Sequence, residues 1–352
     1  MQYELLKYLR CPITKTELRF ELIREFEKKY LDVSISEICD GILFSETGFV
    51  FPVIDGIPRM LIESFYDYSD FLKAHLPTYQ QTKLSIETNY KDLLNHCAAK
   101  NRKTKESFEL EWSLLNINKN DKIWHEDIST LLRVFTEETD RNIEDFEGKE
   151  IIDIGCGHGV ITSKIGEISK LAIGVELSRS IENTYKNNQC RKAWYVQSDL
   201  QFLPFEDSTF DLLYCSGVIH HTNNAELSFL LIESVIKHNG RICLWLYHPQ
   251  KDKLHNIFLL LRKFAKRMPV KSAFVLLSIF VFPPSYIVKK IKRKNAPNYR
   301  EEMIDLLDQF TPEYRFEIPH VLAETWLKQK KYTNIKITTE NKFGFSIVGD
   351  RK

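Results

Sequence analysis

Short apolar runs alternate with amphipathic stretches throughout the second half of the chain. Apolar runs of strand length stand at 151–155, 171–176, 193–197, 210–215 and 241–247. Apolar residues at helical spacing predict helices near 159–169, 179–188 and 224–238. Strands and helices that alternate in this way are typical of a parallel sheet covered by helices. Two further runs, NIKITTE and FGFSIVG, predict two last strands that could form an antiparallel pair.

The first 148 residues follow a different pattern. Residues 1–64 predict a small β-rich domain, because two short apolar runs flank SETG and a DG turn precedes Pro58. Residues 65–148 are polar with patches of helical periodicity, which predicts a helical linker or lid. Residues 149–352 form the predicted main domain, interrupted at 251–330 by a helical insert. The expected fold class is α/β with a small β domain at the N-terminus.

Composition is that of a soluble globular protein of two or three domains. The 352 residues are 43% hydrophobic and 28% charged. Seven cysteines show no paired spacing, which predicts reduced thiols and a cytoplasmic location. The start, MQYELLKYLRCPI, lacks the apolar core of a signal peptide. No uninterrupted apolar run reaches about 18 residues, so we expect no membrane-spanning helix.

The turn after the first strand of the main domain, DIGCGHG, is the leading candidate for a ligand site. Its polar and glycine positions are Asp153, Gly155, Gly157 and Gly159. Glycine adopts positive φ and lets a ligand approach the backbone closely. A turn of this kind between a strand and a helix marks a nucleotide-type site, although dinucleotide dehydrogenases carry a similar one.

Asp199 and the glycine spacing decide between these cofactors, whereas Glu176 suits NAD and S-adenosylmethionine alike. Glu176 ends the second strand, where a carboxylate can accept hydrogen bonds from both hydroxyls of an adenosine ribose. Asp199 follows the third strand, placed to accept a hydrogen bond from an adenine amino group, and Leu200 could cover the ring. The glycine spacing is D-x-G-x-G-x-G rather than G-x-G-x-x-G. Both features favour S-adenosylmethionine over NAD.

Four motifs together carry a family resemblance. DIGCGHG, GVELS, SDLQFLPFEDSTFD and YCSGVIHHT resemble those of class I S-adenosylmethionine-dependent methyltransferases, of the type 11 group that is similar to ubiquinone and menaquinone C-methyltransferases. The resemblance implies a Rossmann-like, seven-stranded sheet whose last strand is antiparallel. It also implies cofactor contacts along Ser216, Gly217 and Val218, beside those of the glycine turn and the two acids.

The N-terminal domain carries a second resemblance. LLKYLRCPITKTEL and FPVIDGIPRML are similar to the small zinc-ribbon-derived domain that activates several tRNA, rRNA and release-factor methyltransferases. Zinc-binding members carry C-P-x-C, whereas this chain has Thr14 three residues after Cys11. Only Cys39 remains nearby, and a closed structural zinc site needs four ligands. We therefore expect a metal-free domain.

Candidate catalytic residues follow the fourth and fifth strands. His220 and His221 in CSGVIHHT could act as a general base, or could instead pack or cap the next helix. Tyr247 and His248 in LWLYHP are candidate pocket walls or proton acceptors. Trp112 and Asp308 lie in segments that resemble stretches of related bacterial methyltransferases and are expected to cover the site. Trp112 could equally be a core residue.

Charge is concentrated in the insert. Residues 251–294 hold twelve Lys/Arg and one acid, a local charge of +11, while the whole chain has a net charge of +1. From 254 to 268, apolar residues share one helical face, and Arg262, Lys263, Lys266 and Arg267 lie on the other. The following apolar stretch contains Pro283 and Pro284, so we expect it to be too short and interrupted to span a bilayer. The alternatives are a plain lid over the substrate pocket, contact with an anionic membrane, and contact with nucleic acid.

Three functions remain open at this stage. The first is methyl transfer to oxygen, nitrogen or carbon of a small or lipid-linked metabolite. The second is an RNA or protein methyltransferase that uses the N-terminal domain for recognition, and the third is a non-catalytic cofactor-binding scaffold. The near-neutral net charge and the missing Asn/Asp-Pro-Pro-Tyr/Phe motif argue against the second, and the intact cofactor motifs argue against the third.

Overall fold

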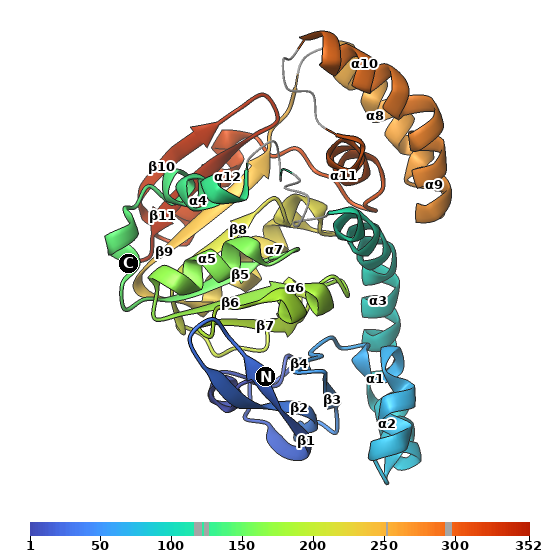
Figure 1. The fold of residues 1–352 in the computed structure, drawn as a ribbon, viewed down its shortest axis with the longest axis vertical. Helices are drawn as coiled ribbons and strands as arrows, with labels where there is room; N and C mark the ends of the chain where they lie inside the picture. Colours follow the sequence, from blue (N-terminus) through green and yellow to red (C-terminus); the bar gives the residue numbers. More distant parts are fainter. Residues whose placement is uncertain (116–121, 123–126, 251–252, 293–297) are drawn as a thin grey trace.

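The computed structural model describes residues 1–352 except 116–121, 123–126, 251–252 and 293–297. Lys251, Asp252, Arg293 and Lys294, which belong to the basic segment of the sequence, therefore lie outside the described residues. The molecule has a small sheet at one end, a seven-stranded sheet in the middle and an outer group of helices at the other end. A long helical arm runs alongside them (Figure 1). The small sheet and the outer helices lie at opposite ends of the molecule.

The N-terminal residues form an antiparallel sheet of four strands in the order β1-β2-β3-β4. A 3-10 helix, Tyr3–Lys7, precedes the strands β1 (Arg19–Lys29), β2 (Ser34–Phe44), β3 (Val50–Ile54) and β4 (Ile57–Pro58). Asp55 and Gly56 both have positive φ, as the DG turn predicts for a tight hairpin between β3 and β4. Just beyond β4, Met60 N donates to Gln197 O, which joins this sheet to the edge of the main one.

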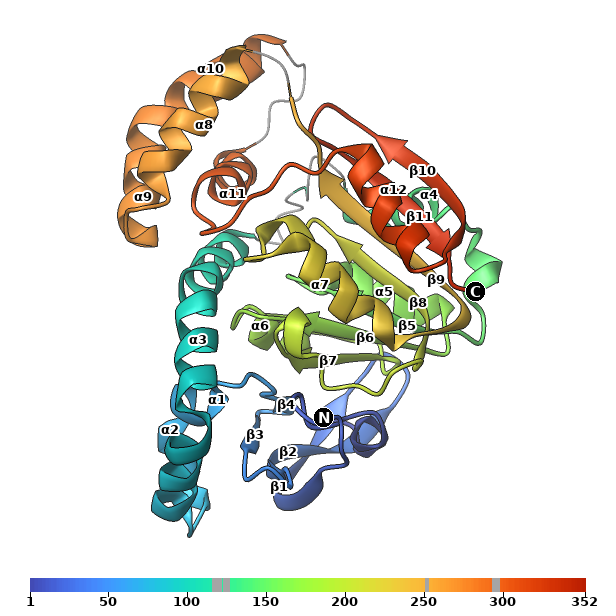
Figure 2. The same ribbon diagram turned by 180° about the vertical axis from the view of Figure 1, so that it is seen from behind.

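Helices connect the two sheets. They are α1 (Ser64–Asp67), α2 (Ser69–His75), α3 (Tyr79–Leu114) and α4 (Leu131–Thr139). The long helix α3 has a kink at Tyr90, where φ is −135°. It runs from the small sheet past the main sheet to the outer helices (Figures 1 and 2). Its C-terminal half therefore covers the edge of the main sheet where a ligand site is expected.

The main sheet has seven strands in the order β10-β11-β9-β8-β5-β6-β7. Its strands are β5 (Glu150–Ile154), β6 (Leu171–Glu176), β7 (Ala193–Gln197), β8 (Phe210–Ser216), β9 (Ile236–Tyr247), β10 (Thr333–Glu340) and β11 (Gly344–Asp350). Only β11, the last strand, is antiparallel to both of its neighbours. The expected Rossmann-like α/β sheet with an antiparallel last strand is therefore confirmed.

Helices cover both faces of this sheet, as the sequence predicts. Helices α4, α5 (Val160–Ile168) and α6 (Ile181–Asn187) lie on one face, and α7 (Ala225–Ile232) and α12 (His320–Gln329) lie on the other (Figures 1 and 2). The helix predicted to reach 238 ends at Ile232, because a 3-10 turn follows and β9 begins at Ile236. Asn239 has positive φ, and the pairing with β8 shifts between Ile236 and Arg241. Because of this local bulge, the apolar pattern of the sequence does not reveal where β9 begins.

The insert consists of helices α8 (Lys253–Ala265), α9 (Val270–Leu276), a π-helical turn (Leu277–Val281), α10 (Phe282–Lys292) and α11 (Tyr299–Phe310). The expected interruption at the two prolines is wrong, because α9, the π turn and α10 form one continuous helix. In the π turn Phe282 N donates to Leu277 O, which loosens the hydrogen-bond register just upstream of Pro283 and Pro284, so the helix continues through two residues that have no N–H to donate. Residues Val270–Val288 are long and apolar enough to cross a membrane by length and composition, with a mean hydropathy of 1.6. The expectation that this stretch is too short is therefore also wrong.

Candidate functional site

A cavity of about 840 Å³ opens at the carboxyl ends of β5, β6 and β8. Helix α3 forms one wall, with Lys100, Phe108 and Trp112, and α11 forms another, with Asp308. The carboxyl ends of parallel strands are where α/β sheets bind ligands. Most of the residues predicted from sequence line this one cavity, although they come from seven separate segments.

The glycine turn lies at the inner end of the cavity. Gly155, Gly157 and Gly159 have φ values of 75°, 52° and 69°. A Cβ at Gly155 would lie 2.2 Å from Val218, and one at Gly157 would lie 2.7 Å from the ring of Trp112. The bare backbone therefore accommodates protein side chains as well as any ligand. Gly155 lines the cavity, whereas Gly159 is the N-cap residue of α5.

Asp153 lies on β5 just before this turn and is buried. Its Oδ2 accepts a hydrogen bond of 2.5 Å from the hydroxyl of Thr162. Burial raises the pKa of Asp153 to about 7. The carboxyl group also lines the cavity, as predicted.

Glu176 lies at the end of β6 with its carboxylate held in place from three directions. Oε1 accepts from the backbone N–H and the hydroxyl of Ser178, at 2.8 and 2.7 Å, and Oε2 accepts from Gly157 N at 3.1 Å. Burial raises its pKa, although these hydrogen bonds oppose the shift. The acid is thus fixed in orientation and lines the cavity next to the glycine turn.

Asp199 is bound by a lysine that the sequence did not indicate. Lys100 Nζ lies 2.5 Å from Asp199 Oδ2 and 2.8 Å from Gln201 Oε1, and the side chains of Lys100 and Asp199 are both buried. Asp199 Oδ1 accepts a hydrogen bond from Gln201 N. Asp199 is thereby the N-cap residue of a short 3-10 turn, Leu200–Phe202. Leu200 lies beside it in the cavity wall.

The loop after β8 completes this end of the cavity. Ser216, Gly217 and Val218 all line it. Gly217 has φ of 80°, and a Cβ there would have no atom within 4 Å. Its surroundings are therefore open toward the cavity, unlike those of Gly155.

The opposite end of the cavity holds four of the predicted side chains in one buried cluster: His220, His221, Tyr247 and Asp308. The Tyr247 hydroxyl donates to Asp308 Oδ2, and His221 Nε2 lies 3.2 Å from Asp308 Oδ1. The guanidinium of Arg315 lies 4.3 Å from the centre of the Tyr247 ring. Burial would raise the pKa of Asp308, but His221, Tyr247 and Arg315 together hold it below the ordinary value.

The two histidines differ in their surroundings. His221 Nδ1 lies 3.0 Å from the carbonyl oxygen of Tyr314, so both of its ring nitrogens face acceptors. His220 is fully buried, its Nδ1 lies 3.4 Å from Tyr247 N, and its Nε2 has no hydrogen-bond partner among the described residues. Burial holds the pKa of His220 well below its ordinary value. A neutral ring that accepts at Nδ1 presents an N–H at Nε2, which suits a hydrogen bond to a ligand better than proton removal.

Two buried glutamates near the cavity were not predicted. Glu138, on α4, lines it and accepts a 2.6 Å hydrogen bond from Tyr214, and burial raises its pKa to about 7. Glu111, on α3, is fully buried with no hydrogen-bond partner for either carboxyl oxygen among the described residues. Burial and the charge of Asp308 raise the pKa of Glu111 well above its ordinary value. Glu111 lies within the SFELEW motif beside Trp112, and its one signal is helical spacing from Lys100 and Phe108 on α3.

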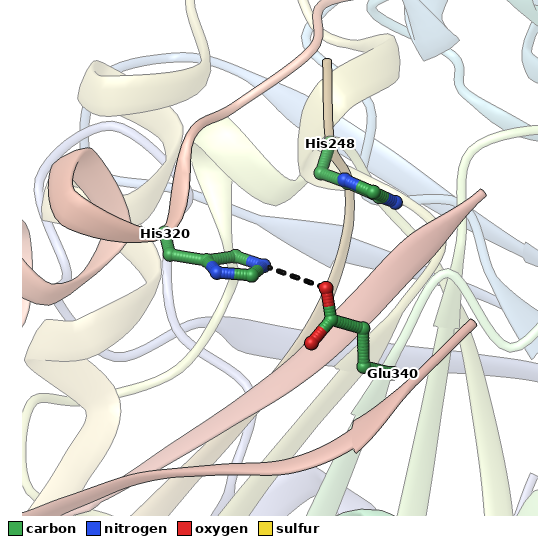
Figure 3. Close-up of side chains that lie close together, drawn as sticks. All are labelled: His248, His320 and Glu340. Carbon is green, nitrogen blue, oxygen red and sulfur yellow. Dashed lines mark ion pairs between the residues drawn. The ribbon is translucent and has the colours of Figure 1, made fainter. Parts of the chain in front are cut away.

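His248 is placed apart from this cluster, at the end of β9. Its Nε2 lies 3.2 and 3.1 Å from the carbonyl oxygens of Asn341 and Lys342. Figure 3 shows His248 beside His320 and Glu340, and His320 Nε2 lies 3.4 Å from Glu340 Oε1. Ligand atoms of these three residues lie within 4.8 Å of one another. The rings of His248 and His320 also stack, with centroids 5.9 Å apart, and the expected absence of metal stays a prediction.

In the N-terminal sheet, the cysteines expected from a zinc ribbon do not form one group. Cys11 Sγ accepts a hydrogen bond from Ser45 at 3.0 Å. Cys39 lies with Asp40 and Asp55, and Cys11 belongs to neither group of possible metal ligands among the described residues. This arrangement is compatible with the expected metal-free domain.

Comparisons with known proteins agree on the main domain. The profile of the family described as "Methyltransferase domain" matches residues 152–244. An uncharacterised protein of Methanocaldococcus jannaschii is 27% identical over 190 residues, which cover 50% of this chain and 78% of that protein. Malonyl-(acyl-carrier protein) O-methyltransferase of Legionella pneumophila is 30% identical over 96 residues, or 26% of this chain. Ubiquinone biosynthesis O-methyltransferase of Coxiella burnetii is 24% identical over 99 residues, or 27% of this chain.

These matches are partial. The chain spans 34% and 42% of the length of the two O-methyltransferases. Among solved structures, magnesium protoporphyrin IX methyltransferase of Synechocystis PCC 6803 with bound SAH covers 71% of this chain and 98% of its own, with 15% identity and a TM-score of 0.42. Residues 152–244, which run from β5 into β9 beside the cavity, thus match a methyltransferase domain, and the cofactor is S-adenosylmethionine.

The residues at the glycine end of the cavity fit this cofactor. A carboxylate offers about four lone-pair sites, and Asp199 uses only two of them on Gln201 and Lys100. Glu176 uses three, but one goes to the Ser178 hydroxyl, which also contacts Ser180 and can turn away. Both acids thus keep capacity for adenosine hydrogen bonds. Bound there, S-adenosylmethionine would supply a methyl group activated by its sulfonium.

Proposed function

We propose that this protein transfers a methyl group from S-adenosylmethionine to a small or lipid-linked metabolite. One observation carries the proposal: a single cavity joins the carboxylates of Glu176 and Asp199 to the buried cluster around His220 and Tyr247. Methyl transfer is an in-line displacement, in which alignment of the acceptor and exclusion of water supply much of the rate. A cavity that is walled by α3 and α11 and has a polar far end suits both tasks.

The far end of the cavity is where the acceptor would bind. His220 offers a buried ring nitrogen without a partner among the described residues, and a buried polar group of this kind favours a ligand that can hydrogen-bond to it. Next to His220, the contact of His221 Nε2 with Asp308 Oδ1 holds the His221 ring in place. We assign His220 to acceptor binding and His221 to positioning. Names of the relatives specify oxygen or carbon acceptors, among them a sterol 24-C-methyltransferase of Schizosaccharomyces pombe, 30% identical over 99 residues.

A role in RNA or protein methylation is less well supported. The cavity is walled by α3 and α11, and much of its lining is apolar. The N-terminal domain is tied to the main domain by buried groups: the Met1 amino group and Tyr185 Oη both contact Glu37. We propose that this domain, which resembles methyltransferase activators, stabilises the main domain from within the same chain. Its zinc-ribbon origin remains part of this proposal.

The decisive experiment is a radiolabelled-methyl transfer assay against small-molecule, lipid, RNA and protein fractions of the source cell. Label in the small-molecule or lipid fraction is expected, and it should be lost in Glu176→Ala. Label only in RNA or protein would replace the proposal by the alternative. Binding of S-adenosylhomocysteine with no label in any fraction would support a non-catalytic scaffold.

A further inference from the structure

The insert exposes apolar side chains where a soluble protein would usually carry polar ones. Eleven of the 27 large apolar side chains that are exposed among the described residues belong to its helices α8, α9 and α10 and the π turn between them. They are Ile257, Leu260, Leu261, Phe264, Val275, Leu276, Ile279, Phe280, Ile287, Val288 and Ile291. Contiguous exposed apolar surface of this kind marks an interaction site, unlike single exposed residues such as Leu31.

On α8 these side chains form one stripe. Ile257, Leu260, Leu261 and Phe264 recur at helical spacing and are each about half exposed, from 48% to 58%. The apolar pattern from 254 to 268 predicted a single shared face, but Phe258 and Ala265 lie on the inner side with α11. The helix therefore has two apolar faces, one packed and one open.

The inner side of the insert packs against α11 in a hydrophobic core. Leu277 is buried in a cluster with Met303, Leu307 and Phe310 of α11, and Phe258 and Phe282 pack against it. Arg262, predicted to be solvated, is also buried there, and donates to the carbonyl oxygens of Phe310 and Pro312 at 3.1 and 2.7 Å. The inner side thus holds the insert on α11 while its outer side stays open.

Helices α8, α9 and α10 are also strongly cationic. Residues 253–292 contain nine Lys/Arg and no Asp or Glu, although Arg262 among them is buried on the inner side. Lys263 and Arg267 are exposed and, at 3.6 residues per turn, border the apolar stripe of α8. An apolar surface edged by cations fits the surface of an anionic membrane, where acyl chains meet phosphate head groups.

We propose that helices α8, α9 and α10 bind an anionic membrane by lying in its surface plane. The occupant is a lipid surface rather than a second protein, because the apolar stripe and the unbalanced positive charge occur together. A spanning orientation is disfavoured because Leu277 and Phe282 would have to leave their cluster on α11. In the plane, the inner side keeps its packing and only the outer side enters the acyl region.

This orientation brings the cavity close to the membrane. Figures 1 and 2 show α8, α9 and α10 as the outermost layer, with α11 between this layer and the sheet. Ser285 of α10 and Asp308 of α11 both line the cavity. An acceptor carried by the membrane could thus reach the cavity from the side of the insert. Membrane binding does not depend on the acceptor proposed above, since it is measured without turnover.

Vesicle flotation with the full-length protein tests the proposal. We expect flotation with phosphatidylcholine vesicles that contain phosphatidylglycerol, much less without it, and weaker binding at high salt. Leu260→Ser/Phe264→Ser should reduce binding about tenfold or more through lost apolar burial. Lys263→Gln/Arg267→Gln should reduce it about fivefold per charge. Leu31→Ser/Val321→Ser, at exposed apolar sites outside the insert, is the matched control and should bind as the wild type.

Each opposite result would overturn the proposal. Absence of flotation at low salt, or equal flotation of the Leu260→Ser/Phe264→Ser variant, would remove the membrane as the occupant. Light scattering in the absence of lipid should find no dimer of the wild type that is lost in the Leu260→Ser/Phe264→Ser variant. Such a dimer would show that a second copy covers the stripe. Extraction at high pH should release the protein from vesicles, and retention would show a spanning helix. Circular dichroism of each variant should match the wild type.

Discussion

Lys100 of α3 and Asp199 after β7 form a buried ion pair, with 2.5 Å between Nζ and Oδ2, in the wall of the cavity. The pair connects the helical arm to the acid that is expected to bind adenine. Removal of one partner leaves the other charge buried and uncompensated, which is more costly than loss of an exposed pair.

Lys100→Met should therefore lower the free energy of unfolding by about 3 kcal/mol, as measured by urea denaturation. Lys164→Met, at an exposed pair with Glu167, should change it by less than about 1 kcal/mol. In a double-mutant cycle with Asp199→Asn, the coupling energy should exceed about 1 kcal/mol. Additive effects in the cycle would show that the two side chains do not interact.

Glu176→Ala should weaken binding of S-adenosylhomocysteine by about 1.5–3 kcal/mol, because hydrogen bonds to a charged group are lost. Isothermal calorimetry measures the change, with Glu182→Ala on the same side of the sheet as the control. NAD should not bind to the wild type. Heat from NAD binding, together with no response to S-adenosylhomocysteine, would show that the cofactor assignment is wrong.

Local patterns in the sequence predicted the cofactor end of the cavity well. The glycine spacing and the acids at strand ends depend on only a few residues each, so Gly155, Glu176 and Asp199 could be placed before the fold was known. Strand β9 was predicted to begin too late, because the bulge around Asn239 breaks its apolar run.

Residues from α3 and α11 could not be predicted in the same way. Lys100 meets Asp199 across 99 positions and Tyr247 meets Asp308 across 61, and such contacts depend on how the helices pack. Trp112 and Asp308 were indicated only by resemblance. The apolar pattern of the insert showed that an amphipathic helix forms, but not which of its apolar residues face outward.

Stability should fall with rising pH because of Glu138, whose pKa is raised by burial to about 7. The folded state holds this proton up to about pH 7, whereas the unfolded chain releases it near pH 4.5, so between these values the unfolded state binds fewer protons. Below about pH 4.5 both states hold the proton, so Glu138 adds no pH dependence. Between about pH 4.5 and 7 it lowers the free energy of unfolding by up to about 1.4 kcal/mol per pH unit.

Urea denaturation between about pH 5 and 8 measures this slope. Glu138→Gln keeps an oxygen to accept from Tyr214 and should make the dependence shallower, while Asp153, whose pKa is also raised to about 7, continues to contribute. Glu137→Gln, at the half-exposed neighbouring position, is the matched control and should leave it unchanged. An equal slope in the Glu138→Gln variant would mean that this carboxyl is ionised in the folded protein.

His220→Ala should lower turnover by about tenfold or more while the affinity for S-adenosylhomocysteine changes little, because the side chain lies at the acceptor end. His221→Ala should also lower turnover, and Asp308→Asn should reproduce its effect if the ion pair positions the ring. The assay follows kcat and KM for the acceptor, with binding calorimetry in parallel. Unchanged turnover in both histidine variants would remove these residues from the reaction.

Metal analysis of the purified protein should find well below one zinc per chain, and a chelator should not unfold the N-terminal domain. The physical reason is that Cys11 is hydrogen-bonded to Ser45 and belongs to neither group of possible metal ligands in the described part of the chain, while a structural zinc site needs four ligands. Two variants locate any metal that is found. Loss of zinc in Cys11→Ser would show that the N-terminal domain is a zinc-binding ribbon. Loss of zinc in His320→Ala would assign the metal to the group formed with His248 and Glu340. Either loss would contradict the metal-free prediction, since bound zinc removed by one substitution must have been held at that site.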